Sequence, residues 1–132
     1  MGRHEQREQL FKLLFRVEFN AAEEMPEQVK LFFQDDEIKY TEKVMETISK
    51  KYELIQEKLP QIDAQLNEKA EGWNIERMGK VELTVLRIAV FEILFDEEVP
   101  GTVAINEAVE IAKQYGQAAS GGFVNAVLAK FV

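Results

Sequence analysis

The sequence has no cysteine, one histidine, one tryptophan and three prolines in 132 residues. Without cysteine the chain forms neither a disulfide nor a thiolate metal site, and a reducing cytoplasm is the expected compartment. No apolar run approaches the roughly 20 residues of a membrane-spanning helix, and the first residues lack the pattern of a secretory signal peptide. These absences favour a folded cytoplasmic domain that makes no use of membranes.

The short motifs that identify common enzymes are missing as well. The sequence has no P-loop, no glycine-rich dinucleotide motif and no serine nucleophile elbow. The two glycines after Ser120 fit a helix entry better than a phosphate cradle. Glu107 and Glu110 are three residues apart, which is typical of a solvated helix face more than of a metal or acid–base site. We therefore expect no enzymatic activity, no metal and no cofactor.

Positive charge is scarce outside one segment. The net charge of −8 argues against broad, nonspecific adhesion to nucleic acid or anionic lipid. Residues 1–16 carry four basic and two acidic residues, residues 17–71 carry seven and fourteen, and residues 72–132 carry five and eight. The N-terminal segment is therefore the one locally basic part of an acidic chain.

The sequence is rich in apolar residues at helical spacing. These predict a helix over residues 3–19, a second over residues 25–33 and a long third one that Pro60 interrupts or ends. A break is expected at Gly72 and Trp73. Further helices are expected over residues 81–95, over residues 102–115 with Thr102 as N-cap and Gly116 as stop, and from Ser120, as cap, to the C-terminus. No alternating pattern is long enough for a strand, so the predicted class is all-α with about seven helices.

Three polar residues lie within or beside apolar patterns. Arg87 is in the middle of an apolar helix, where an unpaired charge is costly, so we expect a structural role and a nearby carboxylate or carbonyl partner. Asn106 and Asn125 each flank a predicted core face. Buried or half-buried amides need partners, so we expect each to tie a helix to a neighbour. The alternative is that they face a ligand.

The order of motifs in the second half resembles a known family. The matching segments are "LRIAVFE" (residues 86–92), "VP" (99–100), "VAINEAVEIAK" (103–113) and, within residues 120–128, Ser120, "FVN" (123–125) and "VL" (127–128). The N-terminal "RHEQREQLFKLLF" is similar to an arginine-rich first helix, with Arg7 and Glu8 as its Arg-Glu pair. These segments resemble the family of the bacterial transcription antitermination factor NusB, with weaker agreement over about residues 20–70.

The resemblance implies a single domain over residues 1–132, made of two small packed helical subdomains over roughly residues 1–70 and 71–132. It implies a non-catalytic factor that binds the boxA element of ribosomal RNA leader transcripts together with NusE, a ribosomal protein, and that joins the RNA polymerase antitermination complex. It leaves open whether the chain is a monomer or a homodimer. An accessory domain of a ribosomal RNA methyltransferase is the alternative within the family; because the sequence ends after the last helix, we favour the first function. A small cytosolic enzyme is the third, least favoured, alternative.

The resemblance also assigns roles to residues. It implies RNA contacts for Arg3, His4, Arg7, Ser120, Gly122 and Phe123, and a contact with NusE for Glu82. The residues alone leave other interpretations open. Glu5 and Glu8 are placed to balance the N-terminal arginines, Phe123 fits a core position equally well, and Glu82 suits a helix N-terminus. The chain has Gly122 where the family often has lysine and Ala119 where it often has an acid. Intrinsic affinity for RNA is therefore expected to be low, with more of the binding left to the partner.

Overall fold

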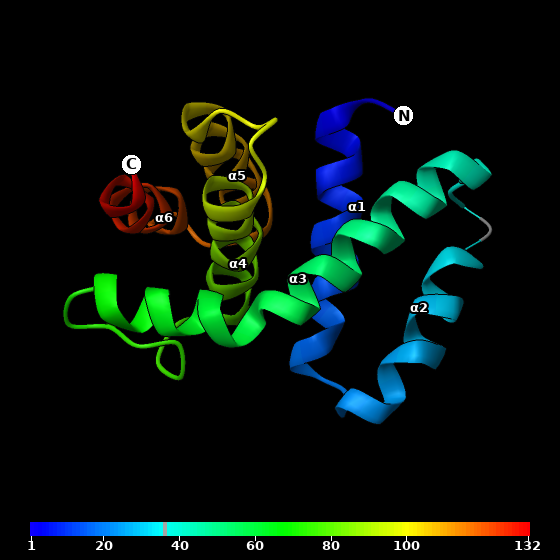
Figure 1. Ribbon diagram of the computed structural model, residues 1–132, viewed down its shortest axis with the longest axis horizontal. Coiled ribbons are helices and arrows are strands. Elements are labelled where there is room, and N and C mark those ends of the chain that lie inside the picture. The colour runs from blue at the N-terminus through cyan, green and yellow to red at the C-terminus, as the bar shows by residue number, and fades with distance from the viewer. Residues whose placement is uncertain (36) are drawn as a thin grey trace. The chain divides into compact units, whose positions relative to one another are not determined.

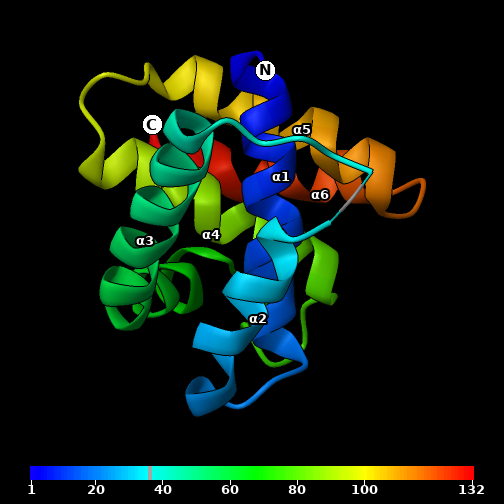
Figure 2. The ribbon, with the colours of Figure 1, turned by 90° about the vertical axis from the view of Figure 1, so that its right-hand side faces the viewer.

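The computed structural model describes residues 1–35 and 37–132, and every regular element in this part of the chain is helical (Figures 1 and 2). The six α-helices are α1 (Arg3–Phe15), α2 (Met25–Phe33), α3 (Glu42–Lys69), α4 (Lys80–Phe95), α5 (Gly101–Tyr115) and α6 (Ser120–Leu128). Three short 3-10 turns accompany them: η1 (Arg16–Glu18), η2 (Ala22–Glu24) and η3 (Ala129–Phe131). The all-α class predicted from the sequence is confirmed.

The chain divides into two compact units, Met1–Leu54 and Ile55–Val132. The division falls inside α3, earlier than the boundary near residue 70 expected from the sequence. The reason is where the second half of α3 is buried. Ile62 and Leu66 are fully buried, and Asp63 on the same stretch forms an ion pair with Arg87 of α4. That stretch therefore belongs to the core of the second unit.

The first unit is built around the apolar face of α1. Leu10, Leu13 and Leu14 are almost fully buried, as their spacing predicts. Gln9 of α1 accepts a hydrogen bond from the hydroxyl of Tyr40 at 2.8 Å. Burial is the main reason that the pKa of Tyr40 is raised, with a further contribution from Asp35. The protonated phenol is the form that donates to Gln9.

The first helix ends four residues earlier than predicted. α1 gives way at Arg16 to the tighter turn η1, and Phe19 is exposed. The carbonyl of Arg16 accepts two hydrogen bonds, from the backbone N–H of Phe19 at 3.1 Å and from the side-chain amide of Asn20 at 2.8 Å. These bonds close the chain into a turn and replace the bonds that a longer helix would make.

The prediction that Pro60 interrupts or ends the third helix is wrong. α3 begins after Thr41, whose hydroxyl accepts a hydrogen bond from the N–H of Val44 at 3.1 Å, and continues through Pro60 to Lys69. A proline inside a helix costs about 3 kcal/mol because a hydrogen bond is lost and the ring meets the preceding turn. Pro60 is exposed, while Ile55 and Ile62 on either side of it are completely buried. Burial of that face on both sides of the proline keeps the helix continuous.

The second unit surrounds α4 with other helices. Every residue from 83 to 92 is buried, which agrees with the apolar character of this helix on all sides. α4, α5 and α6 pack against one another in pairs, and Figure 1 shows them side by side. The buried faces of α5 and α6 include Ala104, Ala108, Ala112, Val124 and Leu128. Small residues on α5 allow this close packing.

Two predicted helix caps are absent. α5 begins at Gly101, one residue before Thr102, and neither α5 nor α6 has a side-chain cap at its N-terminus. The hydroxyl of Ser120 bonds back to the N–H of Gln117 at 2.9 Å and so holds the preceding loop, not the first turn of α6. The predicted stop at Gly116 is confirmed, since α5 ends at Tyr115. The predicted break before α4 is also present, with Gly72 at a φ of +77°.

Within the described residues, no helix combines the length and apolar character needed to cross a membrane. The same part of the chain contains no cluster of three or more histidine, aspartate or glutamate side chains suited to a metal ion.

Candidate functional site

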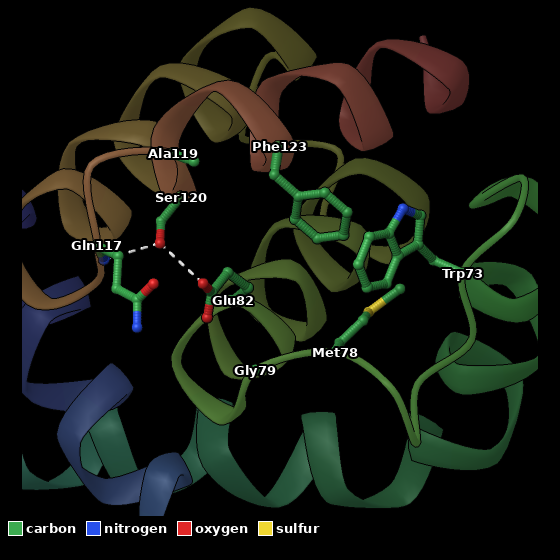
Figure 3. A pocket seen from close by; sticks show the side chains of 8 residues that line it. All are labelled: Trp73, Met78, Gly79, Glu82, Gln117, Ala119, Ser120 and Phe123. Carbon is green, nitrogen blue, oxygen red and sulfur yellow. Dashed lines mark hydrogen bonds between the residues drawn. The ribbon is translucent and has the colours of Figure 1, made fainter.

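A pocket of about 210 Å³ opens in the second unit, where the loop before α4 meets the N-terminal turn of α6. Eight residues line it: Trp73, Met78, Gly79, Glu82, Gln117, Ala119, Ser120 and Phe123 (Figure 3). Three of these, Glu82, Ser120 and Phe123, were predicted from the family resemblance as functional residues. The fold therefore brings them to one place from α4 and α6, 38 residues apart in the case of Glu82 and Ser120.

Aromatic side chains form one wall of the pocket. The rings of Trp73 and Phe123 meet edge to face, with 5.4 Å between centroids and 71° between planes (Figure 3). Phe123 is half-buried, so it is not the core residue that its spacing also allowed. Trp73 is 47% exposed, and the Arg77 guanidinium lies 5.7 Å from its ring centroid. This wall offers flat, polarisable surface beside a positive charge.

Ser120 lines the pocket on the side away from Trp73, and only 3% of the residue is exposed (Figure 3). Its hydroxyl accepts a hydrogen bond from the backbone N–H of Gln117 and donates one to Glu82 at 2.7 Å. Both bonds are drawn in Figure 3. The expectation that Ser120 contacts RNA therefore needs correction, because its hydroxyl is buried and already holds the loop between α5 and α6 to α4.

Glu82 is half-buried in the first turn of α4, which is a favourable place for an acid. One of its carboxylate oxygens accepts the hydrogen bond from Ser120. The other lies over the backbone of Gly79, where a Cβ atom would come within 2.5 Å of it. Glu82 thus has a definite structural function in the pocket, and its predicted contact with a protein partner remains a proposal.

The glycines of α6 differ in their surroundings. Gly121 is buried, and a Cβ on it would lie 3.0 Å from the side chain of Lys113 on α5. Gly122 is exposed, and a Cβ there would meet nothing within 4 Å. Of the two, Gly122 leaves the backbone at the start of α6 accessible, as its predicted role in RNA binding requires.

Arg87 has the kind of partner that the sequence predicted. Its Nε and one terminal nitrogen donate to the two carboxylate oxygens of Asp63, each at 2.9 Å. The Arg87 side chain is 9% exposed and that of Asp63 is 20% exposed. This two-point ion pair joins α4 to α3 within the second unit, which supports a structural role.

The expectation of buried or half-buried amides at Asn106 and Asn125 is wrong, because both residues are exposed. Neither side chain forms a hydrogen bond with any of the described residues. A helix turns by about 100° per residue, so the position after Ile105 or Val124 faces solvent in these narrow apolar stripes. The alternative that these amides face a ligand stays a prediction.

The predicted cationic residues of the first unit lie at the start of α1. Arg3 and His4 are exposed and Arg7 is half-buried. The ring of His4 is 4.0 Å from the carboxylate of Glu8, one turn further along the helix. The four-residue spacing places Arg3 and Arg7 on one side of α1, which suits contacts with successive phosphates.

Trp73, Arg77 and Met78 were not predicted as site residues. Only a helix break was predicted there, because a turn has no periodicity that reveals which way a side chain points. The available signal was a lone tryptophan beside Gly72 with an arginine four residues later. That combination is typical of a surface aromatic with a cation nearby.

Comparisons with known proteins identify the family of the chain. The NusB family model matches residues 4–132. The transcription antitermination protein NusB of Lachnoclostridium phytofermentans is 48% identical over 132 residues, which are 100% of this chain and 99% of that protein. The residues of the pocket, and those of α1 apart from Arg3, fall within the range that the family model matches.

Solved structures show the same fold. NusB of T. maritima superposes with a TM-score of 0.88 at 35% identity, covering 99% of this chain and 90% of the other. A chain in the crystal structure of antitermination factors NusB and NusE in complex with dsRNA superposes with a TM-score of 0.82 at 27% identity, covering 99% and 97%. With a family match over nearly its whole length and close relatives in sequence and structure, the chain belongs to the NusB family.

Proposed function

We propose that this chain is a non-catalytic RNA-binding transcription antitermination factor of the cytoplasm. In this role it binds boxA RNA together with NusE and joins the RNA polymerase antitermination complex. One observation carries the proposal: the chain shares its whole fold and 27% of its residues with a protein solved together with NusE and dsRNA. The name of the relative that is 48% identical supports the same function.

The chemistry of the described residues suits RNA. Binding to RNA needs positive charge for phosphates and flat groups for unpaired bases. The exposed Arg3 and its neighbour Arg7 supply charge on the first unit, and the half-exposed Phe123 with Trp73 supplies flat surface on the second. Gly122 leaves the start of α6 open to a phosphate.

Glu82 is the proposed contact for NusE. Because the carboxylate also accepts the hydrogen bond from Ser120, replacement by lysine would disturb the pocket and the partner contact together. Glu82→Gln is the better variant, since the amide oxygen still accepts that bond while the charge is lost. Weaker binding of NusE by a variant of normal stability would support a charged contact. Unchanged affinity in calorimetric titration would remove Glu82 from the partner surface.

The overall function is tested with purified components. Labelled single-stranded boxA RNA is titrated with the chain, with NusE and with both, and affinity is read from fluorescence anisotropy. We expect weak binding by the chain alone and stronger, sequence-dependent binding by the pair. A scrambled RNA of equal length and composition is the control for charge alone. Equal affinity for both RNAs in the presence of NusE would contradict the proposal.

A further inference from the structure

The lone tryptophan is held in an exposed position by an ordered loop. Trp73 follows Gly72 at the end of α3, and its N–H donates to the carbonyl of Ala70 at 2.9 Å. The next turn is tied back to α3 because the N–H of Ile75 donates to the side chain of Asn67 at 2.9 Å. Asn74 then accepts two hydrogen bonds from the N–H of Arg77, at its carbonyl and its side-chain oxygen. The tryptophan is thus exposed on a loop with many internal bonds, so little ordering is needed when a ligand binds.

The contacts of the ring leave it suited to stacking. Phe123 meets Trp73 edge to face, which fixes the indole without covering it by a parallel ring. Met78, 7% exposed, lies beneath the two rings and closes the apolar floor (Figure 3). Arg77 lies over the indole at 5.7 Å and brings a second planar, positively charged group. A packed hydrophobic cluster would have buried the indole, yet nearly half of it remains accessible.

We propose that Trp73 and Arg77 form a stacking platform for one unpaired base of the bound RNA, with Phe123 as the residue that positions the indole. An unpaired base stacks on aromatic rings and on guanidinium planes. Because Arg77 lies over the indole in the free chain, it moves outward as the base enters and stacks on the far face of the base. The inference rests on the proposed function and adds two residues, Trp73 and Arg77, to the RNA site.

The chain supplies its own optical probe and a matched control. Trp73 is the one tryptophan in the sequence, so emission from tryptophan reports on this ring alone. Phe95, at the other end of α4, is 37% exposed and carries Lys58 over its ring at 5.2 Å. Phe95 thus resembles Trp73 in exposure and in having a cation over its ring, but Phe95 does not line the pocket. Phe95→Leu therefore serves as the control.

The experiment titrates the full chain with the single-stranded RNA used for the proposed function, with NusE added in a parallel series if the chain alone binds too weakly. Anisotropy of labelled RNA gives the affinity, and tryptophan emission is recorded with unlabelled RNA. We expect RNA to quench the tryptophan emission to a plateau, with half of the quenching reached at the RNA concentration that gives half-maximal binding by anisotropy. Trp73→Leu should weaken binding about fivefold to a hundredfold, Trp73→Phe much less, and Phe95→Leu not at all.

A scan of abasic nucleotides locates the base. One abasic position should weaken binding by the wild type and have no further effect on Trp73→Leu, because the base and the ring form a single contact. Thermal melting of each variant checks that it is folded. The quenching experiment uses the wild type alone, so it tests the proposal even where a variant does not fold. Binding by anisotropy without quenching, and with normal affinity of Trp73→Leu, would overturn the platform and leave the proposed function standing. A wild type that binds no RNA, even with NusE, would overturn both.

Discussion

The two compact units offer RNA different chemistry. The first, Met1–Leu54, has nine basic and twelve acidic residues, and the second, Ile55–Val132, has seven and twelve, so each is acidic as a whole. The first has a net-positive segment at residues 1–16, where Arg3 is exposed and Arg7 is half-buried, whereas the second presents the aromatic pair of Trp73 and Phe123. We infer that the first unit contributes salt-sensitive binding and the second contributes stacking that salt affects little.

Arginine itself illustrates the difference. Arg3 is exposed at the N-terminus of the first unit, while Arg87 is buried in the second and bonded twice to Asp63. The same side chain is therefore free to meet a ligand at Arg3, as proposed, and joins two helices at Arg87. Burial and the available partner, not residue type, decide between the two roles.

The largest expected effect comes from breaking the buried ion pair. Arg87→Ala should lower the free energy of unfolding by about 2–4 kcal/mol, because Asp63 is left with its charge unpaired in a largely buried site. Urea denaturation measures the loss. The double variant Arg87→Leu with Asp63→Leu should recover part of it, and the folded fraction of either should keep the salt dependence of RNA binding. Wild-type stability of Arg87→Ala would contradict the structural role.

The second effect compares two glycines on either side of Ser120, one at the end of α5 and one in α6. Gly116→Ala should cost about 1–3 kcal/mol, since some structure must shift to admit the methyl group. A Cβ there would lie 2.7 Å from the carbonyl of Ala112 and 2.5 Å from the hydroxyl of Ser120. Gly122→Ala, six residues later in open space, should raise stability by up to about 1 kcal/mol and still weaken RNA binding by covering the backbone. Equal melting temperatures for the two variants would show that the loop around Ser120 adjusts freely.

The third effect tests charge on the first unit. Arg3→Ala combined with Arg7→Ala should weaken RNA binding and reduce the slope of log affinity against log salt by roughly 1.4, or about 0.7 per phosphate contact. Trp73→Leu, in contrast, should weaken binding with the slope unchanged. Affinities measured by anisotropy at four salt concentrations give both slopes. An unchanged slope for the arginine variant together with a reduced slope for Trp73→Leu would contradict the assignment of salt-sensitive binding to the first unit.

The smallest effect concerns the two exposed amides of the second unit. Asn106→Ala and Asn125→Ala should each change the free energy of unfolding by less than about 0.5 kcal/mol, because neither side chain bonds to a described residue. Thermal melting measures this change, and binding of RNA and of NusE is measured alongside. A loss of binding at normal stability would assign the amide to a ligand contact. A marked loss of stability would restore the structural role that the sequence suggested.

Much of the fold was predictable from periodicity. The all-α class, the range of α2 and the buried character of α4 follow from apolar residues repeating at three and four positions. The carboxylate partner of Arg87 was expected in kind, since a charge in an apolar helix needs one, although nothing in the sequence singled out Asp63. Local rules failed where tertiary packing opposed them: burial on both sides of Pro60 kept α3 continuous, and contacts of the Ser120 hydroxyl with Gln117 and Glu82 replaced a helix cap.

Apolar periodicity predicts most of the helices, and the order of motifs carries the resemblance to the NusB family. The basic N-terminal segment is also evident from the sequence. Which side chains meet depends on how the helices and loops pack. That packing placed Trp73 from a turn against Phe123 from α6, and it joined Glu82 to Ser120 across 38 positions. It also left Asn106 and Asn125 in solvent. The physical reason is that helical periodicity reports only the direction of a side chain about its own helix axis. Contacts between elements depend on how loops and helices pack, and a turn such as residues 70–79 has no periodicity to read.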